Sequence, residues 1–142
     1  MSKNSRILRD QSGSTIVEFA ILAPAIIGLL FGVFQVGLGM QAKNSMRSIA
    51  QETARYAVVE YQKQNEISDA AIENWAEAQA MSAPYLLNSS FDATVTAVGT
   101  PRVDGTFEKT LTLTYTPPAV VPLVNWVSPN LTYTRPIFLL DE

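Results

Sequence analysis

The sequence predicts an α+β protein: a long N-terminal transmembrane helix extends into a small soluble domain with a second helix and an antiparallel sheet of about three strands. Three observations predict this arrangement. An uncharged apolar run extends from Phe19 to Met40, and a helical pattern without proline or glycine continues from Gln41 to Tyr61. After Phe91 the apolar residues alternate with polar ones, as in a half-buried strand.

The apolar run has the length and composition of a membrane-spanning helix. It contains about 22 residues, which at roughly 1.5 Å per residue gives about 33 Å, enough to cross a hydrocarbon core of about 30 Å. Gln35 is its one clearly polar side chain. A core helix of a soluble protein would show a polar face, and this run shows none. We therefore divide the chain into a leader at 1–13, a transmembrane helix at 14–40 and a soluble domain at 41–142.

Two features inside the run bear on its shape and packing. Pro24 cannot donate a hydrogen bond to the carbonyl of Ala20, so a kink or loosened turn is expected there. Gly28 and Gly32 form a GxxxG pair that would permit close helix packing, although this spacing also arises by chance in a glycine-rich helix.

Charge asymmetry predicts the orientation of the helix. The leader carries three cations, which favour a cytoplasmic N-terminus and a soluble domain across the membrane: Lys3, Arg6 and Arg9. A secretory signal peptide is the competing interpretation. Its apolar region is typically about 7–15 residues, shorter than this run, and Met40-Gln41-Ala42 is a poor cleavage site for a signal peptidase.

The helix is expected to continue beyond the membrane to Tyr61. Its apolar and small residues share one face, whereas Lys43, Arg47 and Arg55 lie largely away from it. The members of this stripe are Ala42, Met46, Ile49, Ala50, Thr53 and Ala57. The stripe is expected to pack against the soluble domain, and a helical filament could use the same helix for subunit contacts.

A second helix is predicted near 68–83. Ser68 is the expected N-cap, with Asp69 in the first turn and Pro84 marking the end. Ile67 and Ile72 occupy the two positions of a hydrophobic staple.

We expect Ile72, Trp75 and Ala76 to point inward, Trp75 as a core anchor rather than a ligand platform, and Glu73 and Glu77 to point outward.

The strands follow from alternation. Apolar residues occupy every second position in two threonine-rich segments, and the turn residues at 99–105 between them predict a hairpin. Leu131–Arg135 is a third candidate, which the following Pro136 would restrict to a sheet edge. The inward positions are Phe91, Ala93, Val95, Ala97, Leu111, Leu113 and Tyr115.

The segment 117–130 combines prolines with apolar residues that would be unfavourable in water. Two interpretations stay open: an irregular cover over the sheet, or a docking surface for another component of an assembly or for the membrane interface. The apolar residues are Val120, Val121, Leu123, Val124, Trp126 and Val127.

The composition argues against catalysis. The chain has no histidine and no cysteine, which removes conventional triads, thiolate nucleophiles and ordinary zinc sites. The carboxylates do not cluster at metal-loop spacing, and no phosphate-binding glycine motif is present. With a net charge of −3 and no basic stripe after Met40, nucleic acid is a poor partner. We expect no enzyme activity, metal or cofactor.

The order of residues around Gly13 is distinctive. A basic leader is followed by Gly13, four spacers, Glu18-Phe19 and the apolar helix. This order resembles the class III signal of type IV-like pilins and pseudopilins. The resemblance implies that a prepilin peptidase cuts between Gly13 and Ser14, which makes Glu18 the fifth residue of the mature chain.

The opening Glu18-Phe19-Ala20, with Leu22 and Pro24, resembles that of TadE-like pilus-assembly pseudopilins, and so does the small-residue and arginine segment Ala50–Ala57. Ser14 departs from the phenylalanine that begins most type IV pilins, which favours the Tad branch. The resemblance implies a minor pilin of a Tad-type pilus in the bacterial inner membrane, with a periplasmic domain. It also implies three partners besides the lipid bilayer: the prepilin peptidase, other pilins and pseudopilins, and the inner-membrane assembly platform.

An alternative is an uncleaved single-span envelope protein whose outer domain binds something unrelated. Glu18 discriminates between the two, because a plain anchor has no need of an acid at the edge of the hydrocarbon. In the pilin interpretation, Glu18 pairs with the new α-amino group of Ser14 in its own chain or in a neighbour and sets the register between subunits. In the simpler one, its carboxylate only marks the end of the span.

Overall fold

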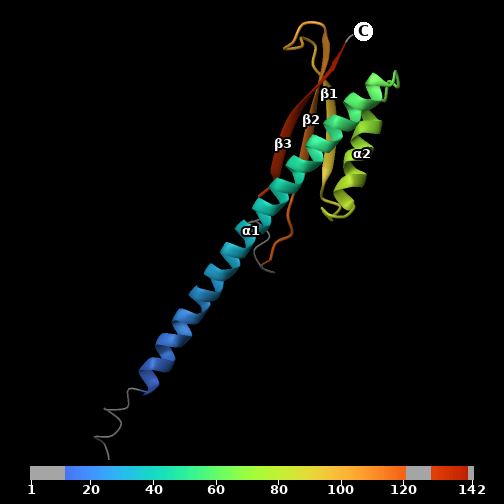
Figure 1. Cartoon of the computed structure of the whole chain (residues 1–142). Coiled ribbons are helices and arrows are strands. Elements are labelled where there is room, and N and C mark those ends of the chain that lie inside the picture. The colour runs from blue at the N-terminus through green and yellow to red at the C-terminus, as the bar shows by residue number, and fades with distance from the viewer. Residues whose placement is uncertain (1–11, 121–128, 141–142) are drawn as a thin grey trace, which may run out of the picture.

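The computed structural model describes residues 12–120 and 129–140. Their element order is α1 (Ser12–Gln62), α2 (Asp69–Met81), β1 (Asp92–Ala97), β2 (Thr106–Tyr115) and β3 (Leu131–Leu140). The predicted α+β fold is confirmed: a long apolar N-terminal helix, a second helix and a three-stranded antiparallel sheet. Figure 1 shows the sheet and α2 gathered around the C-terminal half of α1, while the N-terminal half projects away alone.

Helix α1 is one continuous element of 51 residues, with Pro24 inside it. The predicted extension beyond the apolar run is confirmed, because the helix ends at Gln62. Its end is closed by Gln64 in the left-handed region, φ 61°, and by the Asn65 N–H, which donates to the Glu60 carbonyl at 3.1 Å.

Helix α2 begins where the sequence predicts. The Ser68 hydroxyl oxygen accepts from the Ala71 N–H at 3.2 Å, an N-cap that satisfies one of the unpaired donors of the first turn. Ile67 is half-buried against the core and Ile72 is fully buried, as the hydrophobic staple requires.

Two side chains of α2 differ from the prediction. Trp75 is half-buried, and its ring stacks on Tyr56 of α1 with 4.8 Å between centroids. The buried positions of α2 beyond Ile72 are Ala76 and Ala80, whose small side chains leave the indole outside the core. Glu73 is half-buried and does not point into water: its Oε1 accepts from the Val95 N–H of β1 at 2.7 Å.

The sheet has the order β1-β2-β3, with both pairs antiparallel. Val95 pairs with Leu111 across β1 and β2, so the predicted hairpin is confirmed. The third strand was predicted too short: it continues through Pro136, which pairs with Thr110, to Leu140. An edge strand tolerates proline because a missing N–H on the open side breaks no ladder hydrogen bond.

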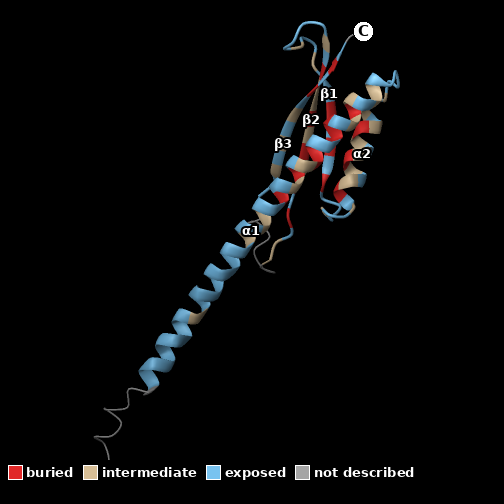
Figure 2. Cartoon of the chain, in the orientation of Figure 1, coloured by how far each residue is buried: buried red, intermediate tan, exposed pale blue. Residues whose placement is uncertain are grey.

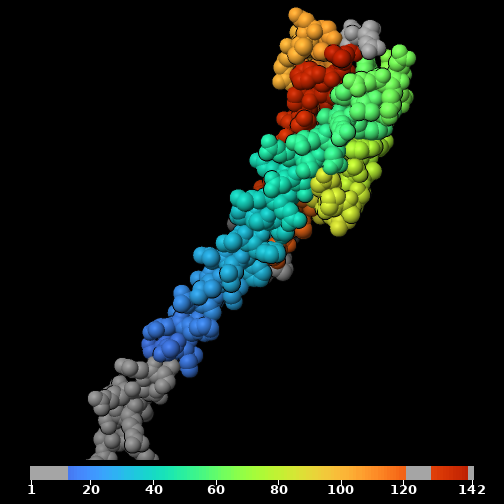
Figure 3. All heavy atoms as spheres, viewed as in Figure 1, coloured from blue at the N-terminus to red at the C-terminus, as the bar shows by residue number. Residues whose placement is uncertain are grey.

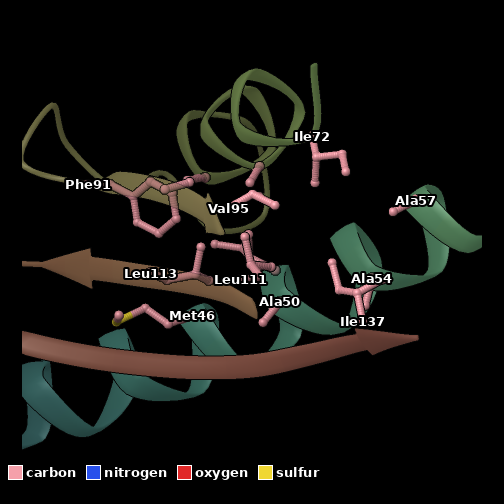
Figure 4. Packing of buried hydrophobic residues seen from close by; sticks show 14 of the residues in the cluster. Met46, Ala50, Ala54, Ala57, Ile72, Phe91, Val95, Leu111, Leu113 and Ile137 are labelled. Carbon is pink, nitrogen blue, oxygen red and sulfur yellow. The ribbon is translucent and has the colours of Figure 1, made fainter. Parts of the chain in front are cut away.

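The core lies between α1, α2 and the inner face of the sheet (Figures 2 and 4). All six members of the α1 stripe are buried, and Thr53, its one polar member, donates its hydroxyl to the Ile49 carbonyl at 2.7 Å. The alternating positions of the sheet are buried as predicted, apart from Ala97 at the end of β1, which is exposed. The sheet contributes Phe91, Ala93, Val95, Leu111, Leu113, Tyr115, Ile137 and Leu139.

Candidate processing and assembly site

The predicted processing residues lie in the first two turns of the described part of α1. Gly13, Ser14, Glu18 and Phe19 are all exposed there, and Ser14 is one turn before Glu18. The Ser14 hydroxyl donates to Glu18 Oε1 at 3.0 Å. The Gly13–Ser14 bond and the acid are thus brought to one accessible end of the helix, whereas the leader cations Lys3, Arg6 and Arg9 lie outside the described residues.

Among the described residues, no contact requires glycine in the N-terminal part of α1, residues 13–41, which we call the arm. A Cβ added at Gly13, Gly28 or Gly32 would meet no atom within 4 Å. If these glycines allow close packing, the packing partner is therefore another molecule. Pro24 is exposed, and α1 continues through it as a helix, so the kink itself stays a prediction.

The arm is apolar and uncovered. Within the described residues, one helix is long and apolar enough to cross a membrane. It lies near the N-terminus, and its most apolar part is not buried by the rest of the protein. Figures 2 and 3 show this arm projecting below the packed domain. Water is a poor solvent for such a surface, which has the length and composition to lie in a bilayer.

The one polar side chain of the apolar run makes a contact that sequence reasoning missed. Gln35 Nε2 donates to the Pro118 carbonyl at 3.3 Å, and the Val120 N–H donates to Gln35 Oε1 at 2.9 Å. The nitrogen and the oxygen of the Gln35 side-chain amide thus both bond to the segment that follows β2. The isolated glutamine in an apolar run was the available signal, but its partner is more than 80 residues away in the sequence.

A second missed site lies at the opposite end of the domain, in the hairpin between β1 and β2. The Glu108 carboxylate is buried, and it accepts hydrogen bonds from the Arg102 N–H at 2.7 Å and from Arg102 Nε at 2.7 Å. These bonds, chiefly that from the Arg102 side chain, lower the pKa of Glu108 below its ordinary value. The Arg102 guanidinium also lies over the Phe138 ring, 5.7 Å from its centroid. The site closes the hairpin rather than exposing reactive groups.

Polar contacts also join α1 to α2. The Glu52 carboxylate accepts from Gln79 Nε2 at 3.2 Å and from the Tyr85 hydroxyl at 2.7 Å, and the latter bond raises the pKa of Tyr85. Lys109 of β2 pairs with Asp69 in the first turn of α2. These contacts fix α2 against its neighbours. Across residues 12–120 and 129–140, no group of three or more acidic side chains could hold a metal ion.

Part of α1 is similar to a known protein family. The model of the TadE-like protein family matches residues 13–55. This chain is TadE-like over that segment. No match was found among curated proteins or among solved structures.

The TadE-like segment is the helix α1 almost alone. It begins at Gly13, includes Glu18 and Pro24, and ends at Arg55, seven residues before the end of α1. It therefore contains the uncovered arm and most of the buried stripe, while α2 and the sheet lie outside it. Of the apolar segment 117–130, Val120 is half-buried against α1 through Gln35, and residues 121–128 lie outside the described residues.

Proposed function

We propose that this TadE-like chain is a minor pilin or pseudopilin that takes part in the assembly of a Tad-type pilus. The observation that carries the proposal is the uncovered apolar arm, which matches the TadE-like family and projects from a small packed domain. A membrane-anchored precursor needs such an arm to cross the bilayer. A subunit in a pilus can bury the same surface against the arms of its neighbours, so one helix serves both states.

The proposal includes processing by a prepilin peptidase after Gly13. The bond between Gly13 and Ser14 lies at the exposed end of α1, and a Cβ on residue 13 would meet no atom of the described residues within 4 Å. Cleavage would give Ser14 an α-amino group. Ser14 and Glu18 already approach one another, with 3.0 Å between hydroxyl and carboxylate, which supports a charge pair at this end of the mature helix.

The proposed topology places the N-terminus in the cytoplasm and the packed domain in the periplasm, because the leader cations precede the apolar helix. The prepilin peptidase, other pilins and the inner-membrane assembly platform are the proposed partners. A reporter fused after Glu142 should be active outside the cytoplasm, and activity in the cytoplasm would contradict this orientation.

The deciding measurement is the N-terminal residue of the mature protein in cells that express the pilus system, read by mass spectrometry. We expect Ser14. A peptidase that acts at a narrow membrane-edge site should tolerate little bulk before the scissile bond, so Gly13→Leu should remain at full length. The folded chain has room for this side chain, so failure to cleave would not reflect misfolding.

Gly28→Leu is the matched control, because residue 28 has equal space on the same arm but lies far from the cleaved bond. It should be processed like the wild-type chain. If the wild-type protein keeps its leader in the presence of the peptidase, processing is wrong, and the uncleaved single-span envelope protein becomes the better interpretation.

A further inference from the structure

The contact between Gln35 and the segment after β2 limits how deeply α1 can sit in a membrane. Residues 116–120 follow β2 without regular secondary structure, and the backbone of Pro118 and Val120 lies within hydrogen-bonding distance of the Gln35 side chain. Irregular backbone is not tolerated in contact with lipid hydrocarbon, because its N–H and C=O groups have no water to bond. The hydrocarbon must therefore end before it reaches this segment.

The outer boundary of the span therefore lies before the end of the apolar run. Composition alone extends the apolar run to Met40. Met40 lies five residues beyond Gln35, or about 7.5 Å along the helix. If the hydrocarbon reached Met40, the backbone at 118–120 would be immersed in it. The uncharged stretch from Phe19 to Phe34 contains 16 residues and spans about 24 Å. This is shorter than a typical hydrocarbon core of about 30 Å, a mismatch that local thinning of the bilayer can accommodate.

We propose that the outer edge of the hydrocarbon lies at Gln35, and that the base of the domain rests in the phospholipid headgroup layer of the outer leaflet. We call this base the foot and define it as Tyr85–Leu87 together with Pro117–Val120. The two segments meet α1 around one shallow hollow of about 170 Å³, lined also by Leu38 and Gln41. The proposal concerns the membrane-anchored chain and does not depend on cleavage or pilus incorporation.

The surface of the foot suits a lipid interface. Leu86 is 71% exposed and is held at the positive φ of 50°, which an aliphatic residue adopts only under constraint. It lines the same hollow as Pro118, beside the point where α1 would leave the membrane. An apolar tip next to a bilayer can enter the headgroup layer, whereas in water its exposure would be unfavourable.

Two cations above the foot point to the same surface. Lys43 and Arg47 are exposed on α1, and among the described residues neither has an acidic partner. Side chains on a helix tilt toward its N-terminus, which here is the direction of the membrane. Long cationic side chains can thus reach back toward anionic headgroups while their carbon stems cover apolar surface.

The depth of the span can be measured by cysteine accessibility, because the chain has no native cysteine. Single substitutions are made in the full chain reconstituted in phosphatidylcholine–phosphatidylglycerol vesicles and treated with a membrane-impermeant maleimide. The positions compared are Leu29, Val33, Val36, Met40 and Asn44, all exposed on α1. We expect Met40→Cys to react at nearly the rate of Asn44→Cys, and Leu29→Cys and Val33→Cys to react at least tenfold more slowly.

Slow labelling of Met40→Cys, equal to that of Val33→Cys, would place the boundary beyond the foot and overturn the proposal. Fast labelling of Leu29→Cys would show that α1 does not cross the bilayer in this register, which also overturns it. The transition from slow to fast should fall between Val33 and Met40, with Val36→Cys intermediate.

Contact between the foot and lipid is tested with a spin label at Leu86→Cys. Val103→Cys is the matched control, because Val103 is another exposed aliphatic residue and lies between β1 and β2. The turn that joins these strands is at the end of the domain farthest from the N-terminal part of α1 (Figure 1). In vesicles at low protein density, the label at residue 86 should be shielded from a water-soluble nickel relaxant relative to the label at residue 103. Equal accessibility would overturn lipid contact. Shielding accompanied by dipolar broadening that grows with protein density would assign the foot to a second copy of the chain and likewise overturn it.

Discussion

The two halves of α1 share one backbone and face two different surroundings. From Gly13 to Gln41 no residue is buried, and large apolar side chains point in every direction. From Ala42 onward, burial returns every third or fourth residue, and most positions between are polar or charged. The change occurs without any break in the helix. Both halves are helical, but they require different surroundings. The first half has no polar face, whereas the second has one and can be half in water and half in a protein core.

The foot connects the halves. Gln35 lies on the exposed arm, yet its amide bonds to the segment after β2. Domain and arm therefore overlap by several residues, and a boundary drawn from hydropathy alone at Met40 cuts through this contact. A single polar residue in an apolar helix can mark where the surroundings change.

The largest effect that separates the halves should come from core truncation. Ile49 is fully buried in the core, with 0% of its surface accessible to solvent, whereas Val33 on the arm is 66% exposed. Ile49→Ala should lower the free energy of unfolding of the domain by about 2–5 kcal/mol, because it removes buried methylene groups and leaves a cavity. Val33→Ala should change it by less than about 0.5 kcal/mol. Urea unfolding of the full chain in detergent, followed by circular dichroism, checks both; equal losses would mean that the arm and the domain unfold as one unit.

The next effect concerns Glu108, which is buried in the domain, whereas Glu18 on the arm is exposed. The bonds from Arg102 lower the pKa of Glu108 in the folded chain below 4.5. They therefore stabilise the fold above the ordinary carboxyl pKa, and this stabilisation is lost as the pH falls through the lowered value. Arg102→Ala should lower Tm at pH 7 and make the decline of Tm between pH 6 and pH 2 shallower.

Arg47→Ala is the control for Arg102→Ala, since Arg47 is an exposed cation without an ion pair in the described chain. It should leave both Tm and its pH dependence unchanged. An unaltered acid profile in Arg102→Ala would show that other carboxylates govern acid unfolding.

Periodicity predicted most of the fold because burial in this protein repeats at the intervals of its elements. The six-residue stripe of α1, the Ser68 cap and the alternating positions of the sheet all follow from local spacing. Gly13 and Glu18 were recognised by their order in the chain. The structure places them on one exposed helix end, while cleavage and subunit register stay predictions.

The remaining features depend on distant partners, which spacing does not contain. Glu73 was expected in water but bonds to Val95, because α2 packs beside the unpaired edge of β1. Trp75 was expected in the core, but the alanines of α2 bring the helices close and displace the ring onto Tyr56. Gln35 finds its partner only when the segment after β2 returns to α1.

A third prediction tests whether the acid of the arm acts between molecules. Glu18 is exposed, and among the described residues its carboxylate accepts a hydrogen bond from the Ser14 hydroxyl, one turn earlier. Glu18→Gln should therefore leave domain stability and insertion unchanged. It should reduce co-purification of other pilus components about tenfold, which corresponds to about 1.4 kcal/mol, if the carboxylate pairs with the α-amino group of Ser14 as proposed.

Ser14→Ala provides the control for Glu18→Gln, since it removes the hydroxyl contact but keeps the carboxylate. It should retain its partners. Full association of the Glu18→Gln variant would mean that the carboxylate is dispensable and that it only marks the end of the span.

The smallest effect is expected from substitutions of two serines, one at the start of each helix. Ser68 caps α2 by accepting from the Ala71 N–H, whereas the Ser14 hydroxyl donates to a side chain on the exposed arm. Ser68→Ala should lower the free energy of unfolding by about 1 kcal/mol, since a backbone donor in the first turn of α2 loses its partner. Ser14→Ala should have no measurable effect on the same transition, because its helix end lies far from the packed core (Figure 2). Urea titrations of the two variants, run beside the wild-type chain, measure the difference. A loss of equal size in Ser14→Ala would show that the arm contributes to domain stability, and the division of α1 into two independent halves would have to be abandoned.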